Sequence, residues 1–141
     1  MSWTKADLRA HYEGLKTPQP STTPAVANFP KNRMNKWESS YAQYLELIRQ
    51  TGAIQWWEFE PVKLRLAQGC YYIPDFWVLR TDGVYEFHEV KGHWRDDALV
   101  KFKVAASQFP FTFIAKSLKA GGWEVVKCID GAEQLRQAGK L

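Results

Sequence analysis

Two strand-forming segments joined by an Asp-Gly turn constrain this chain most. Tyr71–Arg80 and Val84–Lys91 are rich in aromatic and β-branched residues, although Pro74 interrupts the first segment. Residues 81–83 between them read Thr-Asp-Gly, and Asp-Gly readily adopts the positive φ angles of a tight hairpin turn. We therefore predict an antiparallel hairpin that folds residue 75 back towards residue 89.

Hydrophobic periodicity predicts the other elements of the chain. A helix is expected over Asn35–Thr51, with Gly52 as its stop and a broad apolar stripe formed by Trp37, Tyr41, Tyr44, Leu45 and Ile48. Further strands are expected at Ala53–Glu60, Val62–Ala67, Phe111–Lys116 and Trp123–Ile129, and further helices from Asp96 or Asp97 to Gln108 and over Ala132–Ala138. This order predicts an α/β fold with a central mixed sheet flanked by helices.

The chain has 141 residues, which is enough for one domain at 31–141 preceded by an N-terminal arm at 1–30. A short helix is expected at Lys5–Leu15, followed by a Pro-rich extended stretch that ends at Pro30. This arm would wrap the domain, reach a second subunit or lie on a ligand, and the sequence does not choose among these.

Composition excludes some functional classes. No apolar run approaches the roughly 20 residues of a membrane-spanning helix, and the N-terminus lacks a secretory signal, so we expect a cytosolic protein. The formal charge of +4 is compatible with a nucleic-acid partner. Cys70 and Cys128 form no CxxC pair, so we expect free, at least partly buried thiols and no zinc site.

The predicted hairpin brings acidic residues together. Side chains alternate along a strand, so Glu89 and Lys91 share one face and Val90 lies on the other. Asp75, at the start of the partner strand, is expected to meet Glu89 beside the Lys91 ammonium. Carboxylate oxygens, together with the Val90 carbonyl, suit a hard cation such as Mg²⁺ or Mn²⁺.

Phosphodiester hydrolysis is the chemistry that uses such a group. The metal would neutralise the phosphate and activate a water, while Lys91 would orient or deprotonate that water or stabilise the transition state. A plainer interpretation treats Pro74-Asp75 as part of a turn and Glu89 with Lys91 as an ion pair on a solvated edge. The occurrence of both fragments across one hairpin favours the functional interpretation.

The pattern Pro74-Asp75 followed by Glu89-Val90-Lys91 resembles the signature of the PD-(D/E)xK nuclease superfamily. The resemblance covers roughly Asn35–Lys116 and implies a restriction-endonuclease-like core. That core has a helix, three antiparallel strands, a second helix and a further strand. By this resemblance Glu38 on the first helix is a further catalytic and metal-binding residue, although a Glu near a helix start is also favoured by the helix dipole alone.

The segment from Lys91 to Lys116 is similar to that of small phage junction-resolving endonuclease I proteins and of related phage and prophage nucleases. This similarity implies a phage- or prophage-encoded DNA endonuclease that acts on branched or junction DNA as a homodimer in the bacterial host. It implies no membrane partner and no nucleotide cofactor. A nuclease for other DNA ends or RNA, or a non-catalytic nucleic-acid-binding module, remains the alternative.

Basic residues around the signature are candidates for phosphate contacts. With His93 beside the motif, this set is Arg33, Lys36, His93, Lys101, Lys103, Lys116 and Lys119, with Lys31 as a further rim residue. Among the other polar residues we expect His88 to be structural or on the surface, Glu46 to be solvated, and Asp96 and Asp97 to cap a helix.

Overall fold

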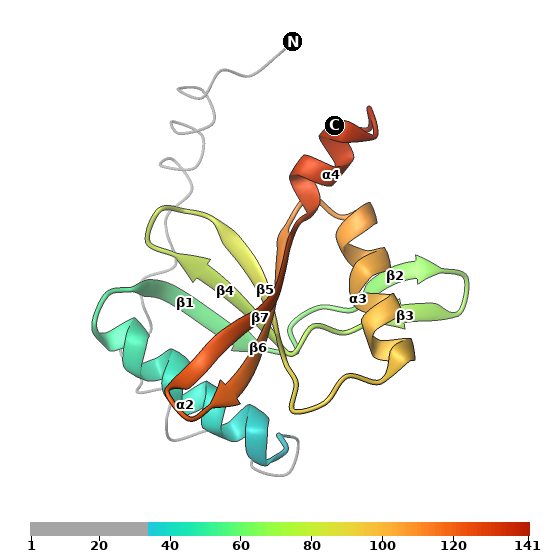
Figure 1. The fold of residues 1–141 in the computed structure, drawn as a ribbon. Coiled ribbons are helices and arrows are strands. Elements are labelled where there is room, and N and C mark those ends of the chain that lie inside the picture. Colours follow the sequence, from blue (N-terminus) through green and yellow to red (C-terminus); the bar gives the residue numbers. More distant parts are fainter. Residues whose placement is uncertain (1–33) are drawn as a thin grey trace.

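The computed structural model describes residues 34–141, which form a five-stranded sheet, a small two-stranded sheet and helices (Figure 1). The helices are α2 (Lys36–Gln50), α3 (Asp96–Gln108) and α4 (Gly131–Gln137). The strands are β1 (Ile54–Phe59), β2 (Leu64–Ala67), β3 (Cys70–Tyr72), β4 (Phe76–Arg80), β5 (Tyr85–Val90), β6 (Thr112–Lys119) and β7 (Gly122–Asp130). The helix predicted at Lys5–Leu15 and the rest of the arm lie outside the described residues.

The larger sheet is mixed and has the strand order β1-β4-β5-β6-β7. Strands β1, β4 and β5 are antiparallel neighbours, β6 runs parallel to β5, and β7 returns antiparallel to β6. The parallel step from β5 to β6 requires a crossover, which α3 supplies. This arrangement confirms the predicted α/β class with a central mixed sheet.

The helices α2 and α3 cover opposite faces of the sheet (Figure 1). Tyr41 and Leu45 of α2 pack against Phe76 and Val78 of β4. The other face carries a separate cluster in which Phe102 of α3 and its neighbours contact a second set of core residues, including Phe87, Phe113 and Ala115. Because successive side chains of a strand point to opposite faces, the sheet contributes to a hydrophobic core on each side. Within residues 34–141, no helix combines the length and apolar character needed to cross a membrane.

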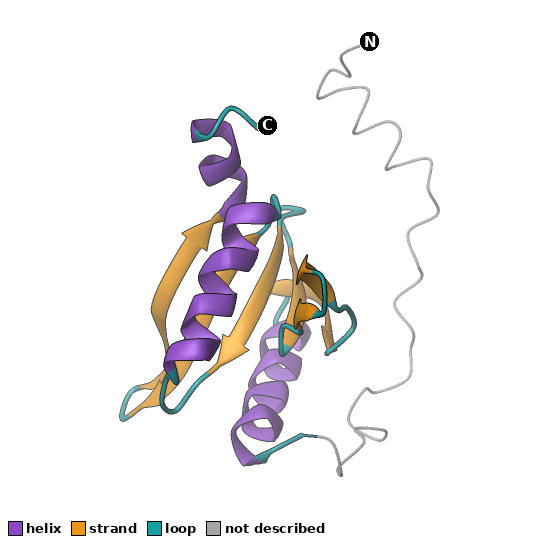
Figure 2. Cartoon of the chain, turned by 90° about the vertical axis from the view of Figure 1, so that its right-hand side faces the viewer, coloured by secondary structure: helices purple, strands orange, loops and turns teal. Residues whose placement is uncertain are grey.

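Strands β2 and β3 form a separate hairpin beside α3 (Figure 2). Leu64 and Leu66 pack on the cluster of the α3 face, while Lys63 and Arg65 are exposed, as their alternation predicts. On the outer side, the Lys63 ammonium lies 4.2 Å from the centroid of the Tyr71 ring. The hairpin therefore extends the α3 side of the molecule without joining the main sheet.

The central hairpin forms as predicted, but its first segment is two strands rather than one. Gly83 adopts φ +85°, and Asp82 accepts a hydrogen bond from the Val84 amide at 3.2 Å. The predicted strand Tyr71–Arg80 is broken at Pro74, which lacks an N–H for a strand ladder. Residues before the break pair with β2 in the small sheet, and those after it pair with β1 and β5.

Two predictions about α2 are wrong. Trp37 was placed in the buried stripe, yet it is 45% exposed, because the apolar face of the helix begins at Tyr41. Glu46 was expected to be solvated, yet it is buried. Its carboxylate forms a salt bridge with Arg49 at 2.7 Å and accepts a hydrogen bond from the Trp57 indole at 3.2 Å, and these partners replace the lost water.

Two further predictions need correction. The N-cap of α3 is Arg95, which makes no side-chain capping bond, and Asp96 and Asp97 lie in the first turn. Their negative charges favour the helix through its dipole rather than through capping. Both cysteines are free thiols, but Cys128 is exposed because β7 is an edge strand.

His88 is buried and structural, so the surface alternative for this residue is excluded. The Tyr41 hydroxyl lies 2.5 Å from His88 Nδ1, and His88 Nε2 lies 2.8 Å from a carboxylate oxygen of Glu86. Arg80 closes the chain with a 3.1 Å salt bridge to Glu86. Burial lowers the pKa of His88, so its neutral ring accepts from Tyr41 and donates to Glu86. This chain ties α2 to β5.

We predict that Tyr41→Phe lowers the free energy of unfolding by about 1–3 kcal/mol, because a buried imidazole nitrogen loses its donor. Urea denaturation followed by circular dichroism measures the change. Tyr44→Phe is the matched control, since Tyr44 stacks on Tyr41 but is only half-buried, and its change should be about 0.5 kcal/mol or less. Equal losses in the two variants would contradict the role given to the Tyr41 hydroxyl.

Candidate active site

Asp75 and Glu89 lie together where β4 begins and β5 ends. Phe76 is aligned with His88 in the antiparallel pair, which places the preceding Asp75 opposite Glu89. The Asp75 amide lies 3.4 Å from Glu89 Oε2, and Asp75 Oδ2 accepts a hydrogen bond from the Val90 amide at 2.8 Å. The two acidic residues are only 8% and 5% exposed. The meeting of the two carboxylates that the hairpin predicted is therefore present.

Lys91 lies beside this pair. Its ammonium forms a salt bridge with Glu89 Oε1 at 2.7 Å and lies 5.9 Å from the centroid of the Trp94 ring. Burial opposes the charge of Lys91, but the carboxylates of Glu89 and Asp75 overcome it and raise the pKa of the ammonium. Lys91 is thus a fixed positive charge in this site. The ammonium, held on the same face as Glu89, matches the predicted alternation around Val90.

The carboxylate of Asp75 is held in an unfavourable environment for a negative charge. Burial, followed by repulsion from Glu89, raises the pKa of Asp75 to about 8, although the Val90 amide and Lys91 oppose this shift. Together, two ionised carboxylates and one ammonium would leave a net negative charge in a nearly dry site. Such a site gains stability from a proton or from a bound cation.

Two contributors to the site were not found from the sequence. The Tyr72 hydroxyl donates a 2.8 Å hydrogen bond to Glu89 Oε2, and burial together with the Glu89 charge raises the pKa of Tyr72, which keeps it a donor. Glu60 has a left-handed backbone with φ +44°, although it precedes Pro61, and its amide donates to the Asp75 carbonyl at 2.8 Å. The signals were a Tyr two residues before Pro74 and a Glu-Pro step after a strand.

Glu38, the third predicted acidic ligand, is engaged elsewhere. Both of its carboxylate oxygens accept 2.8 Å hydrogen bonds from Asn35, one from the amide and one from the side chain, in a capping box at the start of α2. Burial and then the Glu60 charge raise its pKa, while Lys91 lowers it, so Glu38 senses the centre electrostatically. In the described part of the chain, no three Asp, Glu, His or Cys side chains gather as a metal site.

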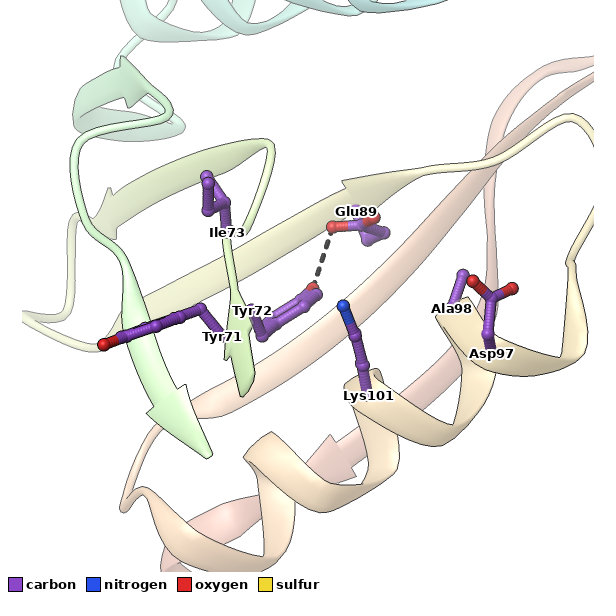
Figure 3. Close-up of a pocket in the computed structure, with 7 residues that line it drawn as sticks. All are labelled: Tyr71, Tyr72, Ile73, Glu89, Asp97, Ala98 and Lys101. Atoms are coloured by element: carbon purple, nitrogen blue, oxygen red, sulfur yellow. Dashed lines mark hydrogen bonds between the residues drawn. The ribbon is translucent and has the colours of Figure 1, made fainter. Parts of the chain in front are cut away.

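A cleft of about 290 Å³ opens beside Glu89, between the β2–β3 hairpin and the start of α3 (Figure 3). Its lining residues are Tyr71, Tyr72, Ile73, Glu89, Asp97, Ala98 and Lys101. The side chains of Tyr72 and Lys101 point towards each other across it, whereas Tyr71 points away. No carboxylate within residues 34–141 forms a salt bridge with Lys101, which leaves its ammonium available to an anion in the cleft.

The other predicted phosphate contacts are not gathered into one groove. Lys36, His93, Lys103 and Lys119 are exposed. Lys116 is half-buried and is aligned with Val90, which belongs to the α2-side core, so it lies across the sheet from the cleft. Arg33 and Lys31 lie outside the described residues. Among these basic residues, only Lys101 lines the cleft beside the acidic pair.

Comparison with protein-family models, with curated proteins and with solved structures gives no match to this chain. Asp75 and Glu89 fit a hard divalent cation because both are oxygen donors and both are buried, and a cation would take the place of the proton that the raised pKa of Asp75 retains. With two side-chain ligands in place, the Val90 carbonyl, water and substrate oxygens would have to complete the coordination.

We predict that Asp75→Asn stabilises the metal-free protein at high pH. Because the folded-state pKa of Asp75 is raised, the folded protein binds this proton more tightly than the unfolded chain. The group therefore causes no loss of stability below about pH 4, the usual Asp pKa, and a full loss above about pH 8. Asn removes the charge and keeps an oxygen for the Val90 amide.

Thermal unfolding in a chelator should show a melting temperature several degrees higher for Asp75→Asn at pH 9, and the gain should shrink as the pH falls and be small near pH 4. Mn²⁺ should raise the melting temperature of the wild type and not that of the variant. Asp96→Asn, at an exposed acid in the first turn of α3, is the control and should show neither effect. A Mn²⁺ response that survives Asp75→Asn would contradict the assignment of this carboxylate as a ligand.

Proposed function

We propose that this protein is a divalent-metal-dependent endonuclease that hydrolyses DNA phosphodiester bonds, with branched or junction DNA as its preferred substrate. The observation that carries the proposal is the trio of Asp75, Glu89 and Lys91 at one point of the molecule. Asp75 and Glu89 approach to 3.4 Å between amide and carboxylate, and Lys91 is 2.7 Å from Glu89. Two carboxylates with an adjacent ammonium suit a cation and a phosphate together.

The order of elements supports the same proposal. Helix α2 is followed by the antiparallel strands β1, β4 and β5, then by helix α3 and by β6 parallel to β5. This is the order of the core in the nuclease superfamily that the sequence resembles, with the β2–β3 hairpin as an insertion between the first two strands. The trio of Asp75, Glu89 and Lys91 also lies where β4 begins and β5 ends, as the resemblance implies.

In this proposal the carboxylates of Asp75 and Glu89 hold Mg²⁺ or Mn²⁺. The cation supplies charge neutralisation of the phosphate and lowers the pKa of a water. The Val90 amide fixes the orientation of Asp75, and the Tyr72 hydroxyl fixes that of Glu89. Lys91 acts as a positive charge that orients the attacking water or stabilises the transition state.

A non-catalytic nucleic-acid-binding module is the second candidate, and one observation favours it. Each carboxylate oxygen of Glu38 accepts a hydrogen bond from Asn35, and binding a metal would have to share or break these bonds. Metal binding and cleavage separate the two candidates, because a binding module needs neither. The same substrate panel, extended to RNA and to flush ends, identifies a nuclease of different preference.

We predict that wild-type protein cleaves linear, flapped or four-way DNA with Mg²⁺ or Mn²⁺, and that Lys91→Ala reduces kcat by about 100-fold or more. DNA affinity should change little in Lys91→Ala, because Lys91 already has Glu89 as its partner. Gel assays of cleavage and fluorescence anisotropy measure the two quantities. Lys140→Ala, at an exposed lysine near the C-terminus, is the charge-matched control. The enzymatic proposal fails if the wild type cleaves none of these substrates in either metal.

We also predict that Lys101 and Lys103 differ, although they stand two residues apart on α3. Both lysines are exposed, but Lys101 lines the cleft next to Glu89 and Lys103 is not part of the lining. Lys101→Ala should lower DNA affinity several-fold and reduce the slope of log affinity against log salt by about one. Lys103→Ala should leave that slope almost unchanged. Identical slopes for the two variants would show that the cleft does not hold a phosphate.

A further inference from the structure

Trp37 is the unusual tryptophan of the described region. It is 45% exposed, in the first turn of α2. Every other tryptophan within residues 34–141 contacts another aromatic ring. An exposed indole leaves a large apolar area in contact with water, so an exposed Trp that has no aromatic partner among residues 34–141 needs a reason in packing or in binding. The core of the protein does not account for this position, because the buried face of α2 begins at Tyr41.

The indole of Trp37 lies at the rim of the candidate active site. Its Cε2 and Nε1 atoms are 3.9 Å from the point where Gly92 would carry a Cβ, and Gly92 directly follows Lys91. Glu38, the next residue along α2, senses the charges of Lys91 and Glu89. Trp37 is therefore held between the start of α2 and the loop that leaves the catalytic strand.

The surroundings of Trp37 suit a nucleic acid better than a protein partner. Its sequence neighbours are Asn35, Lys36 and Glu38, so polar side chains flank the ring along the chain. A stable protein interface buries a wide area around such a ring. A single flat ring with an exposed lysine beside it is typical of sites that stack one base and hold the neighbouring phosphate.

We propose that Trp37 is a stacking platform for an unpaired base of the strand whose phosphate enters the active site. A paired base inside a duplex has both faces covered by its neighbours, so only an unpaired or extruded base can offer a face to the indole. The inference rests on the proposed function and narrows its substrate to DNA with an unpaired nucleotide next to the cut. The site would thereby favour flaps, branch points or single strands over continuous duplex.

Binding measured without cleavage tests the stacking directly. Fluorescence anisotropy of labelled single-stranded, flapped and blunt duplex oligonucleotides is recorded in a chelator, with full-length protein. Trp37→Ala should weaken binding of the first two by about 5- to 100-fold, the range expected for losing one base-stacking contact, and should leave blunt duplex almost unaffected. Trp37→Phe should restore most of the affinity, because it keeps an aromatic face.

Leu47→Ala is the matched control, since Leu47 is on the same helix and is 59% exposed. It should leave all three affinities unchanged. Fluorescence supplies a reading that a structural role would not move. Binding of oligo-dT to the wild type should quench its tryptophan emission. Trp37→Phe should lose most of that quenching, while its melting temperature stays the same.

The outcomes separate this inference from the proposed function. Selective loss of unpaired-strand binding in Trp37→Ala supports stacking even if no DNA is cleaved, in which case the hydrolytic proposal alone falls. Cleavage by the wild type, together with Trp37→Ala affinities that match those of the wild type for all three oligonucleotides, overturns the stacking platform alone. An equal loss on single-stranded, flapped and duplex DNA also overturns it, because it assigns Trp37 a general rather than a base-stacking role.

Discussion

The carboxylates of Asp75 and Glu89 repel each other in a site that water scarcely reaches. Three neighbouring groups stabilise the two carboxylates. The Val90 amide donates to Asp75, and the Tyr72 hydroxyl and the Lys91 ammonium donate to Glu89. These contacts fix the direction of both carboxylates, yet they do not offset the cost of ionising both, as the raised pKa of Asp75 shows. The side chains are thus held in place, but a second negative charge in this site lacks a full counter-charge. A bound divalent cation would supply it.

The backbone around Pro74 makes this geometry possible. Proline ends the hydrogen-bond ladder of β3, so the chain passes from the small sheet to the large sheet between Tyr72 and Phe76. Asp75 lies in this connection, next to the end of β5. Glu60, which follows β1, stabilises the same connection because its amide donates a hydrogen bond to the Asp75 carbonyl. Tyr72, still in the small sheet, reaches Glu89 in the large one. The site is therefore built at the junction of two sheets and is held from both.

The sequence predicted the parts of this protein that depend on local patterns. The Asp82-Gly83 turn and the alternation around Val90 depend on short-range geometry, so the meeting of Asp75 with Glu89 and Lys91 could be inferred from them. Features that depend on tertiary packing could not. Helical periodicity does not predict that Glu46 of α2 points inward towards Trp57, or that the first turn of α2 lies outside the core.

The same limit applies to the predicted ligands and phosphate contacts. Glu38 had two interpretations in the sequence, and the structure shows the capping box, a local contact with Asn35 that uses both carboxylate oxygens. Lysines that are close in sequence separate in space, because helix position decides that Lys101 lines the cleft and Lys103 does not. A set of basic residues in a sequence indicates charge, but only the fold says which charge faces the site.

Successive side chains of β5 point to opposite faces of the sheet and have different surroundings there. Glu86, His88 and Val90 face α2, where the chain from Tyr41 through His88 to Glu86 and Arg80 is satisfied in every hydrogen bond it requires. Phe87 and Glu89 face α3, where Glu89 meets Asp75, Tyr72 and Lys91. The polar network on the α2 face ties β5 to α2 and β4 through contacts that do not involve the carboxylate pair on the other face. Together with the ladders to β4 and β6, these contacts position the strand that carries Glu89.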